Sequence, residues 1–100
     1  MVIPYAHVKT LEELEAVARH EMIDVATSCT QILEKVLICQ GINIGLNLGQ
    51  AAGAGIPDHL HMHVLPRWQG DTNFLPTLAH TKVISFDLTQ IYQKLKPAFI

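Results

Sequence analysis

One short segment of the chain, DHLHMHVLPRW, carries half of its six histidines at alternate positions: His59, His61 and His63. Side chains on a β-strand point alternately to its two faces, so in a strand these three imidazoles share one face. The residues between them are apolar and would anchor the opposite face: Leu60, Met62 and Val64. Each imidazole brings two ring nitrogens that need partners, so a row of three indicates chemistry rather than core filling.

Two kinds of chemistry use imidazoles in such a row. Imidazole is a common zinc ligand, and two histidines two residues apart on a strand can face one ion. Further ligands would have to come from candidates that stand at no recognised spacing: Asp58, Asp71 and His80. In the alternative, one imidazole attacks an electrophile while its neighbours orient it or donate hydrogen bonds to developing charge. The histidines by themselves leave both readings open.

A glycine-rich segment, GQAAGAGIPD, runs directly into the histidines. Small residues permit close approach to the backbone, and N–H groups around Gly53 to Ile56 can cradle phosphate oxygens. Such a segment on its own is more often only a turn. Beside three aligned imidazoles, it favours nucleophilic attack on a phosphate-bearing substrate.

Apolar periodicity predicts the helix that supports this site. Thr10 and Glu13 form a capping-box pattern, which predicts a helix that begins near Leu11 and ends at Gly41. Its apolar residues recur at spacings of three and four and predict the stripe that faces the core: Leu14, Ala18, Met22, Val25, Cys29, Ile32 and Val36.

The remaining elements follow from alternation and turn residues. INIGLNLG, residues 42–49, predicts a strand that forms a hairpin with the histidine strand across a long connection. Residues 67–81 predict a loop, KVIS at 82–85 a short strand, and LTQIYQKLKPAF a terminal helix with Pro97 at its limit.

This order of elements predicts a single α+β domain over residues 1–100. Its antiparallel sheet carries the long helix on one side, and a helix ends the chain. The opening run MVIPYAHV is strand-like and has no polar lead-in, so we expect further strands to belong ahead of it.

Composition excludes several classes of protein. Seven Lys and Arg against nine Asp and Glu give a net charge of −2, and no basic run could follow a nucleic-acid backbone. Cys29 and Cys39, ten residues apart in the predicted helix, form no disulfide framework. The sequence has neither the roughly 18 to 20 apolar residues of a membrane span nor a signal peptide, so we expect a cytoplasmic protein.

The histidine segment with its flanks resembles a known family. HLHMHVL has the His-x-His-x-His signature, followed by two apolar residues, of the histidine-triad (HIT) nucleotide hydrolases and transferases. The stretch INIGLNLGQAAGAGIPDHLHMHVLPRWQGDTNFLP is similar to the bacterial branch described as diadenosine tetraphosphate phosphorylases or hydrolases. MVIPYAHV and YQKLKPAF also resemble parts of that branch. The resemblance implies a HIT-like α+β fold.

The resemblance also implies a role for each histidine. His61 would attack the α-phosphorus and form a covalent nucleotidyl-histidine, which water or inorganic phosphate then resolves. His63 would donate a hydrogen bond to the phosphate or leaving-group oxygen, and the main chain at His59 would hold the His61 tautomer. By the same resemblance the chemistry needs neither metal nor cofactor.

Other residues would bind the dinucleoside polyphosphate or nucleotide substrate. The resemblance implies that the backbone at Ala54, Gly55 and Ile56 grips the phosphates and that Asn47 hydrogen-bonds near the scissile bond. Trp68 would border the nucleotide or leaving-group site, although a tryptophan that covers the edge of the core fits the residue equally well. Family members commonly form homodimers, which we expect here.

The chain departs from the family at two places. Members usually have two more strands and a Gly-His pair ahead of the sequence that matches VIP, so the chain resembles a domain shortened at the N-terminus; His7 reads as a loop histidine. Several members carry a hydroxyl residue where this chain has Ala54 and Gly55.

Three alternatives to the dinucleoside polyphosphate enzyme remain open: a catalytically weak nucleotide-binding or dimerisation module, a nucleoside phosphoramidate hydrolase, and a metal-dependent hydrolase.

Overall fold

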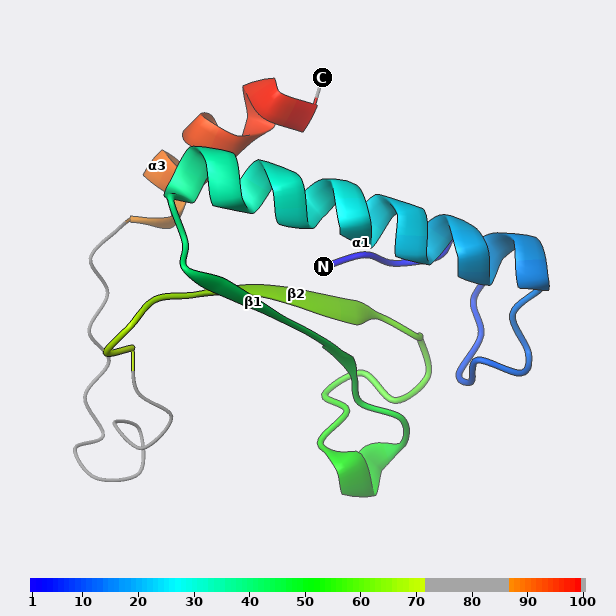
Figure 1. Cartoon of the computed structure of the whole chain (residues 1–100). Helices are drawn as coiled ribbons and strands as arrows, with labels where there is room; N and C mark the ends of the chain where they lie inside the picture. The colour runs from blue at the N-terminus through cyan, green and yellow to red at the C-terminus, as the bar shows by residue number, and fades with distance from the viewer. Residues whose placement is uncertain (72–86, 100) are drawn as a thin grey trace.

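The computed structural model of the chain describes residues 1–71 and 87–99. Its elements follow in the order α1 (Ala16–Leu37), β1 (Gly41–Leu46), the 3-10 helix η1 (Gln50–Ala52), β2 (Met62–Arg67), α3 (Leu88–Leu95) and the 3-10 helix η2 (Lys96–Phe99). Helix α1 lies across one face of the β1–β2 pair, and α3 and η2 pack near the carboxyl end of α1 (Figure 1). The predicted α+β class is confirmed.

Strands β1 and β2 form the predicted antiparallel hairpin. The register pairs Gly41 with Arg67 at one end and Leu46 with Met62 at the other. Because paired residues share a face, the pairs at alternate positions point toward α1: Ile42 with Pro66, Ile44 with Val64, and Leu46 with Met62. The other face carries Asn43 with Leu65 and Gly45 with His63. The hairpin therefore separates an apolar face under α1 from a face that holds His63.

The core lies between this apolar face and α1. Its buried cluster draws on the N-terminal segment, α1 and the residues around β2: Val2, Leu14, Met22, Ala26, Leu60 and Met62. The N-terminal segment runs along the edge of β2 that β1 does not use. Val2 and Met62 exchange backbone hydrogen bonds of 2.8 and 2.9 Å, and the Leu60 N–H donates to the Val8 carbonyl at 2.8 Å. The chain around Met62 is therefore held by β1 on one edge and by the N-terminal segment on the other.

Helix α1 begins five residues later than predicted. The capping box does form, because the Glu13 N–H donates to Thr10 Oγ1 and the Thr10 N–H to Glu13 Oε2, each at 3.3 Å. These bonds close a separate turn, and the Arg19 guanidinium donates to the carbonyls of Leu11 and Leu14. Those carbonyls are therefore satisfied by a side chain, and regular helix starts only at Ala16.

The predicted core stripe of α1 is correct except at Val25: Cys29 packs against the core, and Ile32 and Val36 are half-buried. Met22 is buried, as predicted, but Val25 is 42% exposed, and Ala26 and Leu33 are buried instead. Both sets of residues satisfy a period of 3.6, so the period alone does not choose between them.

The elements after α1 are shorter than predicted. Gly41 does not cap α1: the left-handed cap is Ile38, with φ 52° and ψ 43°, and Gly41 opens β1. Strand β1 ends at Leu46 rather than at residue 49. Helix α3 begins on the N-cap Asp87, close to the predicted start, whereas Pro97 lies inside η2 and does not end the helix. The predicted strand at 82–85 and His80 lie outside the described residues.

Candidate active site

The backbone at the start of β2 holds the ring of His61 in one orientation. Nδ1 of His61 lies 2.9 Å from the carbonyl oxygen of His59. A carbonyl oxygen can only accept, so Nδ1 carries the proton and the lone pair of His61 is left on Nε2. Within residues 1–71 and 87–99 no hydrogen bond engages this Nε2. A half-buried imidazole whose unprotonated nitrogen has no hydrogen-bond partner can act as a nucleophile.

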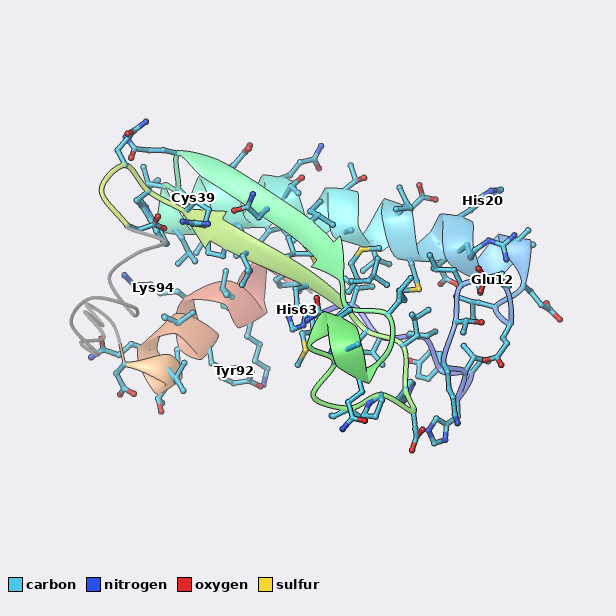
Figure 2. All side chains as sticks on the ribbon, turned by 90° about the horizontal axis from the view of Figure 1, so that it is seen from below. Glu12, His20, Cys39, His63, Tyr92 and Lys94 are labelled. Atoms are coloured by element: carbon cyan, nitrogen blue, oxygen red, sulfur yellow. The ribbon has the colours of Figure 1, made fainter. Side chains whose placement is uncertain are left out.

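His63 lies next to this nucleophilic ring. The ring centroids of His61 and His63 are 5.0 Å apart and nearly perpendicular, at 76°. β2 begins at Met62, so of the three histidines predicted to lie on one strand only His63 does. The register places His63 on the face that α1 does not cover, and Leu60 and Met62, on either side of His61, are buried at 3% and 4% exposure. Figure 2 looks at the sheet from that side, with His63 near the end of the hairpin that carries η1. A substrate group bound to His61 would therefore lie next to the imidazole of His63.

His59 ties the triad to the N-terminal segment. Its Nε2 donates to the carbonyl of Pro4 at 3.1 Å, and its ring lies 4.8 Å from the ring of His7. Nearby, Lys9 and Asp58 form an exposed ion pair at 3.3 Å. The ring of His59 thus points to the N-terminal segment while its carbonyl serves His61. Sequence analysis read His7 only as a loop residue and missed this ring contact.

The glycine-rich loop leaves two backbone donors open. Gly49 and Gly53 adopt left-handed φ angles of 86° and 91°, which only glycine adopts readily, and they fold the loop around η1. The Ala54 N–H donates back to the Gly49 carbonyl at 3.3 Å. In the described part of the chain, no hydrogen bond engages the N–H groups of Gly55 and Ile56. These two N–H groups can donate to phosphate oxygens without breaking a hydrogen bond within the described residues.

Asn47 connects the loop to the histidine face. Its Nδ2 donates to the carbonyl of Gly53 at 3.3 Å, directly after the end of β1. Asn47 and His61 each lie one residue beyond the last printed pair of the hairpin, Leu46 with Met62, so both stand at the same end of the sheet. Among the described residues, the Asn47 side-chain oxygen and its second N–H have no hydrogen bond and could bind a ligand.

Trp68 lies at the far end of β2 from His61. Its indole N–H donates to the Ile38 carbonyl at 3.1 Å and so holds the turn after β2 against the end of α1. That contact agrees with a tryptophan covering the core edge, and it leaves the ring faces uncommitted.

A second network in the same turn was not foreseen from the sequence. The Arg67 guanidinium binds both oxygens of Asp71 at 2.9 to 3.1 Å and Asn43 Oδ1 at 2.8 Å. This hydrogen bonding holds the pKa of Asp71 below its ordinary value and raises the pKa of Arg67. In the sequence, the only sign of this ion pair is the spacing of four residues between Arg67 and Asp71.

The candidate metal ligands do not come together in the described ranges. Asp58 pairs with Lys9 and Asp71 with Arg67. Among residues 1–71 and 87–99, no three His, Cys, Asp or Glu side chains gather as ligands of one ion would. In the same ranges no helix is long and apolar enough to cross a membrane.

Known proteins resemble the chain in sequence and in fold. The family model described as HIT domain matches residues 1–70, and the chain belongs to this family of histidine-triad proteins. A Mycobacterium tuberculosis protein named AP-4-A phosphorylase is 40% identical over 84 residues, which are 84% of this chain and 43% of that protein. The asymmetrical bis(5'-nucleosyl)-tetraphosphatase of Schizosaccharomyces pombe is 32% identical over 71 residues, 71% of this chain and 38% of that protein.

Solved structures have the same fold as this chain. A zinc-bound histidine triad family protein from Mycobacterium smegmatis superposes with a TM-score of 0.72 at 26% identity, over 96% of this chain and 64% of that one. The NitFhit protein of C. elegans superposes with a TM-score of 0.71 at 24% identity, over 96% of this chain and 20% of that one, and shows the fold alone. The chain spans less than half the length of the two curated relatives.

Proposed function

We propose that the chain catalyses nucleotidyl transfer from a dinucleoside polyphosphate such as diadenosine tetraphosphate, through a covalent intermediate on His61. The observation that carries the proposal is the 2.9 Å contact between His61 Nδ1 and the His59 carbonyl, which leaves Nε2 as the nucleophile. Family membership and relatives named AP-4-A phosphorylase and bis(5'-nucleosyl)-tetraphosphatase support the substrate class.

The proposed reaction has two displacements at one phosphorus atom. In the first, Nε2 of His61 forms a bond to the α-phosphorus, the bond to the bridging oxygen breaks, and ATP leaves from diadenosine tetraphosphate. His63 donates a hydrogen bond to the departing oxygen as its negative charge grows. In the second, water or inorganic phosphate attacks the same phosphorus and breaks its bond to His61, which releases AMP or ADP.

The rest of the site would hold the phosphates during both steps. The N–H groups of Gly55 and Ile56, which have no partner among the described residues, would donate to nonbridging oxygens. The Ala54 N–H already donates to the Gly49 carbonyl, so Ala54 would act by holding the two N–H groups that follow it in place. Asn47 would hydrogen-bond near the scissile bond, and Trp68 would lie toward the leaving-group end.

Product analysis tests the reaction. The purified chain is incubated with diadenosine tetraphosphate with and without inorganic phosphate, and the nucleotides are identified by mass spectrometry. ATP with ADP, only when phosphate is present, identifies a phosphorylase; ATP with AMP in its absence identifies a hydrolase. Intact-protein mass after a rapid quench at alkaline pH, where a phosphorus–nitrogen bond to histidine persists, should show an added adenylyl group.

A matched pair of variants assigns the reaction to the triad. We expect His61→Ala to lower turnover by at least about 10³ and to abolish the adenylyl adduct. His20→Ala removes an exposed histidine on α1, far from His63 in Figure 2, and should leave turnover unchanged. Unchanged turnover in His61→Ala, or equal loss in both variants, would rule the mechanism out.

A homodimer and a cytoplasmic location remain predictions. Sedimentation analysis of the purified chain measures the first, and fractionation of cells that express it measures the second. Wild-type protein that binds diadenosine tetraphosphate without converting it would instead support the binding-module alternative.

A further inference from the structure

A glycine stands one residue before the end of β1, directly across from the third triad histidine. The register pairs Gly45 with His63, and both lie on the face that α1 leaves open. Glycine weakens the interior of a strand, and there it often marks a place where a ligand or another backbone approaches closely. The φ angle of Gly45 lies outside the left-handed region, and a Cβ built there meets no atom within 4 Å. Neither the backbone nor packing within the described residues therefore requires glycine at this position.

Within the described residues, Gly45 is exposed on the open face of the sheet. The next pair along the strands on the same face is Asn43 with Leu65, and Leu65 is 51% exposed. On the other side lies Asn47, held by the Gly53 carbonyl. Directly opposed Cβ atoms in an antiparallel pair are about 5 Å apart, so a side chain at position 45 would stand beside the His63 ring.

The proposed chemistry indicates which part of a substrate would cross the open face at Gly45. His63 donates to the oxygen that leaves the α-phosphorus, so the atoms beyond that oxygen lie next to His63. Position 45 is the nearest residue of β1 to His63 on this face. The leaving group therefore passes over Gly45, whereas the nucleotide that remains on His61 lies toward Asn47 and the glycine-rich loop.

We propose that Gly45 is a specificity-determining residue, whose missing side chain gives a bulky leaving group room against the sheet beside His63. The leaving group that fits this description is a polyphosphate chain that carries a second nucleoside. A side chain at position 45 would exclude it and would still admit a small leaving group such as ammonia. This inference rests on the proposed function, since it takes His61 as the nucleophile.

Two glycines of the same strand provide the test and its control. Gly41 lies on the same face as Gly45, opposite Arg67 at the other end of β1, and a Cβ built there also meets nothing within 4 Å. Values of kcat/KM are measured for wild type, Gly45→Val and Gly41→Val with two substrates that share one adenylyl group. Diadenosine tetraphosphate has a bulky leaving group, and adenosine 5'-phosphoramidate releases ammonia.

The proposal makes a selective prediction. Gly45→Val should lower kcat/KM about tenfold or more for diadenosine tetraphosphate and leave that for the phosphoramidate within a factor of about two. Gly41→Val should change neither by more than that factor. Equal losses on both substrates, or the same selectivity in Gly41→Val, would overturn the proposal. Thermal melting followed by circular dichroism verifies folding, and Gly45→Ala supplies a smaller step if the valine variant does not fold.

Equilibrium binding separates this inference from the proposed function. A methylene-bridged analogue of diadenosine tetraphosphate and AMP are titrated into the same proteins. If wild type binds the analogue but converts neither substrate, the proposed function fails, and the Gly45 inference is decided by binding alone. Gly45→Val must then weaken the binding of the analogue more than the binding of AMP. Equal weakening, or no binding of the analogue by wild type, contradicts the inference.

Discussion

Replacing Met62 by alanine removes a buried side chain between two of the triad histidines. Met62 is 4% exposed and belongs to the core cluster, so its truncation leaves a cavity beneath His61 and His63. Buried Met→Ala changes cost about 2–5 kcal/mol of unfolding free energy. Leu65 lies on the opposite face of the same strand and is 51% exposed, so about half of its transfer free energy is at stake, or about 1 kcal/mol.

Urea unfolding of wild type, Met62→Ala and Leu65→Ala measures this difference. Met62→Ala should shift the midpoint to lower urea by about 1 M or more, and Leu65→Ala by a smaller amount. The turnover of each variant, normalised to the folded fraction, should also fall more in Met62→Ala, because the cavity frees the strand that aligns the two rings. A larger loss of stability in Leu65→Ala would refute the assignment of the two faces.

Three further predictions concern the ends of the elements. The Arg67 hydrogen bonds lower the pKa of Asp71 from its ordinary 3.8, so they stabilise the fold above that pH and cease to do so as the carboxyl protonates. Asp71→Asn should therefore lose thermal stability at neutral pH, with the difference from wild type disappearing in strong acid; a difference that grows in acid contradicts the pairing. Ile38 holds a left-handed conformation that costs a β-branched residue about 1 kcal/mol, so Ile38→Gly should raise Tm and Ile38→Ala should not. Trp68→Phe removes the indole hydrogen bond to Ile38 and should cost about 1 kcal/mol in denaturant unfolding, while an unchanged midpoint would show that the bond adds nothing.

The sequence predicted the parts of the fold that depend on local patterns. Strict alternation from Leu60 to Val64 placed the apolar residues under α1 and the histidines on the open face, and the register confirms this for His63. The turn residues between the strands predicted a hairpin, and Asp87 caps α3 through the Thr89 N–H. Each of these depends on neighbours within a few residues.

Features that depend on distant partners were not predictable in the same way. The capping box gave a turn instead of a helix start because Arg19 reaches back to the carbonyls of Leu11 and Leu14. The choice of Ala26 over Val25 for the core depends on how α1 rotates on the sheet, which no helical period encodes. At the site, motif resemblance supplied the histidine roles, while the contacts of His59 with Pro4 and His7 appear only in the folded chain.

The hydrogen bond between the His59 ring and Pro4 joins residues 55 positions apart, which makes the site dependent on the order in which the chain folds. Helix α1 needs only contacts about four residues apart and can form in about a microsecond, whereas closing a long loop first costs chain entropy. We expect refolding to restore the helical circular dichroism signal before nucleotide binding. On warming, the N-terminal segment should detach first, so binding should fade while α1 persists. Simultaneous loss of both signals would contradict this order.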